Sequence, residues 1–84
     1  MQVQVKLFAA ARDIVGQGEV SLQLTEGSTV GDLMEHFFTR YPQLKAMAGS
    51  LLLAVNREFA ERTVKLQEGD EVGVIPPVSG GGQV

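Results

Sequence analysis

One stretch of this 84-residue chain has the periodicity of a long amphipathic helix, and it limits the folds that the rest can adopt. Its apolar residues recur at intervals of three and four: Val30, Leu33, Met34, Phe37, Phe38 and Tyr41. Thr29 and Asp32 resemble a capping box at its start, and Pro42 ends it because the residue before a proline avoids the α-helical region. A single helix of this kind covers only one face of a sheet, so we interpret the stripe as the helical half of one core.

The segments before the helix have the alternation of half-buried β-strands. Residues 3–7 alternate apolar and polar side chains, and residues 20–24 repeat the pattern. We expect these two strands to pair as in a hairpin. Residues 9–15 between them, closed by Gly16, predict a short helical turn or a wide loop.

Three more strands are expected after the helix. Residues 51–55 are continuously apolar, which is typical of a strand covered on both faces or carrying an interface on one. Residues 63–66 predict a short strand, and residues 71–75 predict the last one, which ends at Pro76-Pro77 because proline cannot donate a ladder hydrogen bond. Turns are expected on either side of the short strand, at Asn56-Arg57 and Glu68-Gly69-Asp70.

This order of elements predicts an α+β fold, the β-grasp (ubiquitin-like) roll, with a mixed sheet of four to five strands packed on one main helix. In such a roll the first and last strands are parallel neighbours. We assign residues 1–78 to this domain. Residues 79–84 form a glycine-rich C-terminal tail, which we expect to be flexible because it has nothing to bury.

Composition argues against several classes of function. The net charge of −3 and the scattered basic residues argue against nucleic-acid binding. No apolar run approaches the roughly 20 residues needed to cross a bilayer, and the start lacks a basic signal region, so we expect no membrane contact and a cytoplasmic location. The chain has no cysteine, which excludes disulfides, thiolate metal sites and thiol catalysis. The single histidine, His36, is interpreted as solvated, and we expect no metal site and no bound cofactor.

The acidic residues near the end of the domain are interpreted as a solvated turn and not as a site. They are Glu68, Asp70 and Glu71.

Several stretches of the chain resemble a known family. The most specific is Gly69-Asp70-Glu71-Val72 running into Ile75-Pro76-Pro77-Val78-Ser79-Gly80-Gly81, and the similarity extends to residues 5–13, 40–42 and 54–56. These stretches resemble the small, sulfur-carrying subunits of molybdopterin synthase, which are ubiquitin-like proteins of the MoaD/ThiS family. Related thiamine sulfur carriers share the Gly-Gly end but usually lack the Pro-Pro-Val-Ser approach to it.

The resemblance implies a chemistry for the tail. In this family an E1-like adenylyltransferase uses ATP to adenylate the C-terminal glycine. The adenylate becomes a thiocarboxylate, whose sulfur is delivered inside the large subunit to make the molybdopterin dithiolene. By this analogy the protein is a non-catalytic carrier in a heterotetramer with the large subunit, and Gly81 is the reacting residue after Gly80.

The residues after Gly81 add a requirement. A thiocarboxylate forms only at a free carboxyl terminus, and Gly82, Gln83 and Val84 follow Gly81 in this chain. Either a maturation protease trims the tail, as we expect, or this copy of the protein has lost or changed the role. A cut after Gly82 would also leave a Gly-Gly end. The chemistry suits the composition, because a chain without cysteine has no side-chain thiol to carry sulfur. Fully extended, the tail from Pro76 to Gly81 spans roughly 20 Å.

Strand alternation predicts a partner surface at the base of the tail. If the inner positions of the first and last strands face the helix, Phe8 and Ile75 point outward as neighbours, and Leu52 and Ala54 extend their apolar patch. The alternative is that Phe8 folds over the sheet edge into a satellite core. The remaining partner-binding candidates are Arg12, Pro76, Pro77, Val78 and Ser79, of which Arg12 is equally well explained as a solvated surface residue.

Three functions stay open at this point. The first is the sulfur carrier of molybdopterin synthase. The second is a ubiquitin-like modifier, or a sulfur carrier for another pathway such as thiamine or cysteine synthesis. The third is a β-grasp interaction module whose tail has no chemical role.

Overall fold

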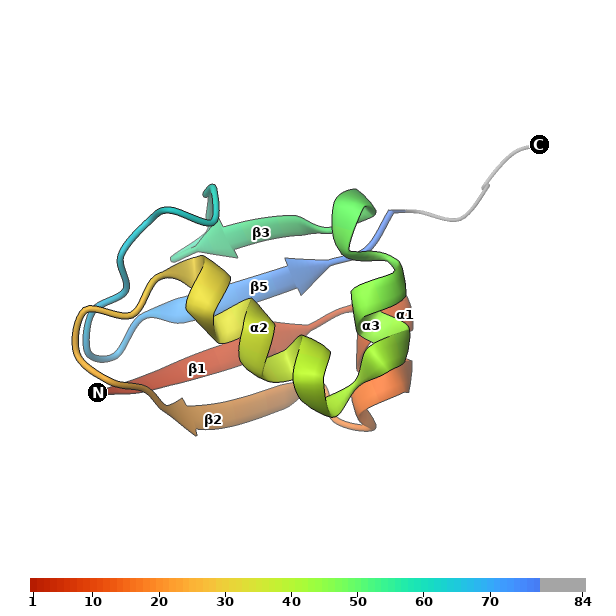
Figure 1. The fold of residues 1–84 in the computed structure, drawn as a ribbon, viewed down its shortest axis with the longest axis horizontal. Helices are drawn as coiled ribbons and strands as arrows, with labels where there is room; N and C mark the ends of the chain where they lie inside the picture. The colour runs from red at the N-terminus through yellow and green to blue at the C-terminus, as the bar shows by residue number, and fades with distance from the viewer. Residues whose placement is uncertain (78–84) are drawn as a thin grey trace.

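A five-stranded sheet with one long helix across it forms the body of the protein (Figure 1). The computed structural model describes residues 1–77, so Val78, Ser79 and the three glycines that follow them lie outside the described residues. In chain order the elements are β1 (Gln2–Leu7), α1 (Ala9–Val15), β2 (Glu19–Gln23), α2 (Val30–Arg40), α3 (Pro42–Ala46), the 3₁₀ helix η1 (Ala48–Ser50), β3 (Leu52–Val55), β4 (Glu58–Phe59) and β5 (Glu71–Ile75).

The strands lie in the order β2-β1-β5-β3-β4. The central pair β1 and β5 is parallel, with Val5 opposite Val72 and Leu7 opposite Val74. The other neighbours are antiparallel. Helix α2 lies across one face of this mixed sheet (Figure 1). The predicted α+β β-grasp roll, with its hairpin-like first pair and parallel first and last strands, is confirmed.

Helix α2 begins and ends as its sequence predicts. The Thr29 side chain accepts from the Asp32 N–H at 3.2 Å, and the Asp32 carboxylate accepts from the Thr29 N–H at 2.9 Å. This capping box satisfies backbone donors that a helix start leaves without partners. The helix ends at Arg40, and Pro42 then begins α3, a short helix that the sequence pattern did not predict.

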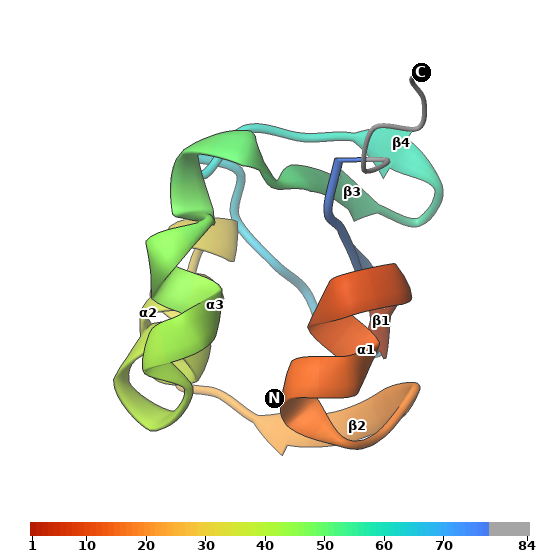
Figure 2. The same ribbon diagram turned by 90° about the vertical axis from the view of Figure 1, so that its right-hand side faces the viewer.

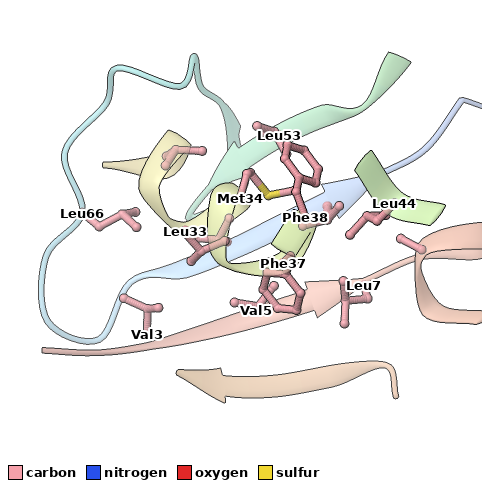
Figure 3. Close-up of a cluster of buried hydrophobic side chains, with 14 residues drawn as sticks. Val3, Val5, Leu7, Leu33, Met34, Phe37, Phe38, Leu44, Leu53 and Leu66 are labelled. Carbon is pink, nitrogen blue, oxygen red and sulfur yellow. The ribbon is translucent and has the colours of Figure 1, made fainter. Parts of the chain in front are cut away.

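The core lies between α2 and the inner face of the sheet (Figure 3). It confirms that the apolar stripe of α2 is core, because Phe37 is only 2% exposed and Leu33 is fully buried. Helix α3 adds Leu44 and helix α1 adds Ala11 to the same cluster. The remaining members are Val3, Val5, Leu7, Val30, Met34, Phe38, Leu53, Leu66, Val72 and Val74.

The prediction of a strand at residues 63–66 is wrong. Only an isolated bridge joins Lys65 to Thr29, and the short strand β4 lies earlier, directly after the Asn56-Arg57 turn. The reason is the start of α2, whose first N–H groups need acceptors. The N–H groups of Val30 and Gly31 donate to carbonyls of Val64 and Arg62, each at 2.9 Å, so this segment caps the helix and does not join the sheet.

The acidic turn near the end of the domain is confirmed as a turn, but its carboxylates are not simply solvated. Glu68 accepts from the Gln2 N–H at 2.9 Å. Asp70 accepts from the Gln67 N–H at 2.9 Å and from the Asn56 side-chain amide at 3.0 Å. These bonds tie the loop before β5 to β1 and to the turn after β3.

Candidate functional site

The sheet face opposite α2 is divided into a polar half and an apolar half. Register places Glu71, Gly73 and Ile75 of β5 on this face, together with alternate residues of the neighbouring strands. On the β2 side it is polar, with an ion pair between Lys6 and Glu71 at 3.7 Å. On the β3 and β4 side it is apolar.

The apolar half consists of Phe8, Leu52, Ala54, Phe59 and Ile75, and we call these five residues the outer patch. Phe59 is 75% exposed, Leu52 is 52% exposed and Phe8 is 46% exposed. All three are large side chains whose burial on a partner would be favourable at about 25 cal/mol per Å². Exposed apolar residues are ordinary when single, but a contiguous group of them is typical of an interaction surface.

Gly73 lies beneath the outer patch. A Cβ atom at this position would lie 3.6 Å from the Phe8 ring, 3.9 Å from the Ala54 Cβ atom and 3.9 Å from the Ile75 side chain. The three side chains therefore converge over one glycine of the central strand. Because glycine has no side chain of its own there, the Phe8 ring reaches across β5 toward β3.

The backbone at the end of β1 fixes the position of Phe8. Its N–H donates to the Val74 carbonyl at 3.2 Å, which continues the parallel ladder by one residue. Ala9 then has a φ of 49°, and the chain turns into α1. The ring stays on the outer face as strand alternation predicts, and it does not belong to the buried core, so the satellite-core alternative is wrong.

The last described residues of the chain lie beside this patch. Ile75 lies opposite Leu52 in the β3–β5 ladder, and Pro76 and Pro77 follow it. Pro77 is exposed, whereas Pro76 is buried. Pro76, which we predicted as a partner contact, therefore packs within the domain and fixes the direction of the chain.

Arg12 is not brought together with the outer patch. Its side chain lies near Gly18, with Nε 3.5 Å from where a Cβ atom of that residue would lie. Gly18 precedes β2 and accepts from the Leu7 N–H through its carbonyl, so Arg12 lies on the side of β1 away from Ile75. It is exposed, which agrees with its interpretation as a surface residue.

Phe59 is the member of the patch that sequence reasoning missed. A signal for it was present, because the Asn56-Arg57 turn joins β3 to a strand that must pair with it. In the resulting register Phe59 lies opposite Ala54, on the same face. If the turn is taken as a β-hairpin, the outward side of β3 predicts that Phe59 also points outward.

A metal site and a membrane-spanning helix find no support in the described part of the chain. His36 is exposed on α2 and contacts the edge of the Phe37 ring. Residues 1–77 contain no group of three His, Cys, Asp or Glu side chains arranged to hold a metal ion. None of the helices in these residues has both the length and the apolar character needed to span a membrane.

The sequence matches the description of one protein family along nearly its whole length. The model of the ThiS family matches residues 5–81. The chain belongs to the ThiS family. It is 35% identical over 83 residues to the molybdopterin synthase sulfur carrier subunit of Chlamydomonas reinhardtii, covering 96% of this chain and 100% of that protein.

Solved structures agree with this membership. Small archaeal modifier protein 1 from Haloferax volcanii superposes with a TM-score of 0.85 at 26% identity, covering 95% of this chain and 99% of that one. The Pyrococcus furiosus candidate for subunit 1 of molybdopterin converting factor superposes with a TM-score of 0.83 at 34% identity, covering 93% and 99%. The chain is thus a ubiquitin-like β-grasp protein similar to molybdopterin synthase sulfur carriers.

Proposed function

We propose that this protein is the sulfur carrier subunit of a cytoplasmic molybdopterin synthase. The observation that carries the proposal is the position of the outer patch at the base of the tail that contains Gly80 and Gly81. A partner that binds the patch would lie close to the residues that precede Gly80 and Gly81, so its own active site could bind the end of the tail. The family match extends to residue 81, and the relative from Chlamydomonas reinhardtii bears this function in its name.

The proposed chemistry occurs at the main-chain carboxylate of Gly81, once the residues that follow it are removed. The carboxylate attacks the α-phosphate of ATP in an E1-like adenylyltransferase, and pyrophosphate leaves. Hydrosulfide then attacks the acyl carbon of the adenylate and displaces AMP, which leaves a thiocarboxylate on the glycine. Within the large subunit the thiocarboxylate sulfur attacks the pterin precursor, and water then hydrolyses the resulting acyl–sulfur bond, so that the sulfur stays on the dithiolene and the glycine carboxylate is regenerated.

The outer patch supplies the docking energy in this proposal. Phe8 and Phe59 are large, exposed aromatic residues, a type that is enriched in the buried cores of protein interfaces. The polar half of the same face, including the pair of Lys6 and Glu71, borders the patch. We propose that the large subunit and the adenylyltransferase use this patch in turn.

Intact-mass analysis of the protein from cells that are making molybdenum cofactor tests the proposal. We expect a form that ends at Gly81, or at Gly82, in which sulfur replaces one oxygen of the terminal carboxylate. Recovery of only the unmodified chain, with Gln83 and Val84 still attached, would overturn it.

A second function is favoured by one observation, the close superposition on small archaeal modifier protein 1. In that case the terminal glycine would be joined to lysines of other proteins. Digestion of cell extracts and a search for lysines that carry a residual glycine tail separates the two functions. A sulfur carrier for another pathway would form the thiocarboxylate in cells that make no molybdenum cofactor, and an interaction module with an inert tail would show neither modification.

A further inference from the structure

The two edges of the sheet differ in how open they are to another strand. At one edge β4 has only two residues, whereas at the other edge β2 has five residues in regular register with β1 (Figure 2). Short strands protect a sheet edge from pairing, and so do bulges and prolines. The β2 strand has none of these features, and within residues 1–77 no segment pairs with its outer side.

The hydrogen bonds of β2 show which of its backbone groups are free. The Leu7 N–H donates to the Gly18 carbonyl, and the Leu24 N–H donates to the Met1 carbonyl. Antiparallel pairing alternates, so the even-numbered residues between Gly18 and Leu24 also face β1. The N–H and C=O groups of Glu19, Ser21 and Gln23 therefore point away from the sheet.

A groove runs beside this edge, between β2 and the C-terminal half of α2. Its floor is apolar, because the half-buried Val20 and Leu22 meet the rings of Phe37 and Tyr41 there. These two rings are stacked, with centroids 6.1 Å apart and an interplanar angle of 25°. The full lining is Gln17, Val20, Ser21, Leu22, His36, Phe37, Arg40 and Tyr41.

The rim of the groove carries one cationic side chain, that of Arg40. Asp32 and Glu35 line a neighbouring hollow that Arg40 also lines. The Arg40 guanidinium lies over the Tyr41 ring at 5.9 Å from its centroid. His36 contacts the Phe37 ring edge-on. The lining contains no acidic residue, and neither Asp32 nor Glu35 on the same helix forms an ion pair with Arg40.

We propose that the β2 edge and this groove bind an extended peptide segment of a partner protein as a sixth strand. Main-chain hydrogen bonds to Ser21 and its neighbours would hold the segment. Alternate apolar side chains of the segment would enter the groove, and an acidic side chain would pair with Arg40. The outer patch lies on the β5–β3–β4 side of the sheet, so the two surfaces can be occupied together, and this proposal does not depend on the function of the tail.

A designed peptide tests the proposal. The probe has seven residues, with valine and threonine alternating and an aspartate at each end, and both termini are blocked. We expect its addition to the ¹⁵N-labelled protein to shift amide resonances of β2 and of residues 36–41. A matched probe with lysine at each end should bind at least tenfold more weakly, and a probe with a central proline should bind more weakly because it lacks a strand N–H. Resonance shifts confined to the outer patch would overturn the proposal.

Two substitutions separate backbone pairing from charge recognition. Of the backbone hydrogen-bonding groups, Ser21→Pro removes only an outward N–H, so the ladder to β1 is kept, and we expect at least tenfold weaker binding of the aspartate probe. Ser21→Ala is its matched control, because both changes lose the 3.0 Å bond from the Ser21 hydroxyl to Gln4, and it should bind like the parent.

Arg40→Glu should reverse the preference between the aspartate and lysine probes. Equal binding by Ser21→Pro and Ser21→Ala, or an unchanged preference in Arg40→Glu, would overturn the proposal, and Arg40→Glu alone decides if Ser21→Pro does not fold.

Discussion

Phe8 has two roles at the level of a single side chain. Part of its ring covers Gly73, and the remaining 46% of the residue is open to a partner. We expect Phe8→Ala to weaken association with the large subunit at least tenfold, because about 1.4 kcal/mol is a factor of ten in affinity. The free energy of unfolding should fall by much less than the roughly 3–5 kcal/mol typical of a buried phenylalanine. Urea unfolding and partner titration on the same variant measure both effects.

Phe37→Ala is the matched control, because Phe37 is 2% exposed. It should lose the full stability of a core phenylalanine. A Phe8→Ala variant that is destabilised as strongly as Phe37→Ala, with unchanged affinity in its folded fraction, would place Phe8 in the core and contradict the prediction.

The half-buried Asp70 has a structural role. Its carboxylate accepts from Gln67 and from Asn56, which joins the loop before β5 to the turn after β3. We expect Asp70→Ala to lower the free energy of unfolding by about 1–3 kcal/mol, since hydrogen bonds to charged groups are worth more than neutral ones. Glu35→Ala is the control and should have little effect, because Glu35 is exposed on a helix and glutamate and alanine both favour helices. Equal urea midpoints for the two variants would show that the Asp70 bonds contribute nothing.

At the level of elements, local patterns were sufficient for most of the fold. Alternation predicted β1 and β2, and the apolar stripe and capping box predicted α2 with its start. The short strand β4 was missed because two residues carry no periodicity. The expected strand at residues 63–66 failed because the start of α2 needs backbone acceptors, and a periodicity argument does not count those.

Strand alternation also predicts part of the candidate site. Outward alternation at the ends of β1 and β5 identifies Phe8 and Ile75 from the sequence. Phe59 requires the hairpin register, and the burial of Pro76 depends on packing after the last strand, so neither follows from alternation alone.

The hairpin between β3 and β4 gives an element-scale prediction. Asn56 and Arg57 have φ values of 52° and 71°, a left-handed pair for which Asn-Gly is the favoured sequence. A non-glycine residue with these backbone angles destabilises the folded state by roughly 1–2 kcal/mol. Glycine removes this strain, but it also makes the unfolded chain more flexible, which cancels part of the gain in stability. We expect Arg57→Gly to raise the free energy of unfolding by about 0.5–1 kcal/mol in urea titrations. Arg57→Ala keeps the strain and should not gain, so an equal gain in both variants would assign the effect to loss of the Arg57 side chain.

At the level of the whole molecule, the parallel pairing of β1 and β5 determines where function can lie. Both strands end at the same edge of the domain, so Phe8 and the base of the tail become neighbours although they are at opposite ends of the sequence. The inner face of the sheet is used for the core, and half of the outer face stays apolar. A partner bound to the outer patch would therefore lie beside Pro76 and Pro77, which precede the glycine-rich tail in the sequence.

This division between domain and tail predicts that stability and activation can be separated. The described core consists of residues between Val3 and Val74, so Gly80→Ala and Gly81→Ala in a chain ending at Gly81 should unfold at the same urea concentration as the parent. Both should fail to form the thiocarboxylate with the adenylyltransferase, ATP and a sulfur donor. The added Cβ atom makes the chain wider where it must enter a narrow active site, and it disfavours positive φ.

Intact mass after a fixed reaction time measures the modified fraction, and Ser79→Ala is the control because that position already has a Cβ atom. We expect Ser79→Ala to be modified like the parent. If Gly80→Ala and Gly81→Ala also react at the parent rate, close approach of the backbone is not needed, and the glycines of the tail must be explained by flexibility alone. If Gly80→Ala and Gly81→Ala react slowly and are also less stable, the tail contributes to the stability of the domain. Stability and activation are then not separable.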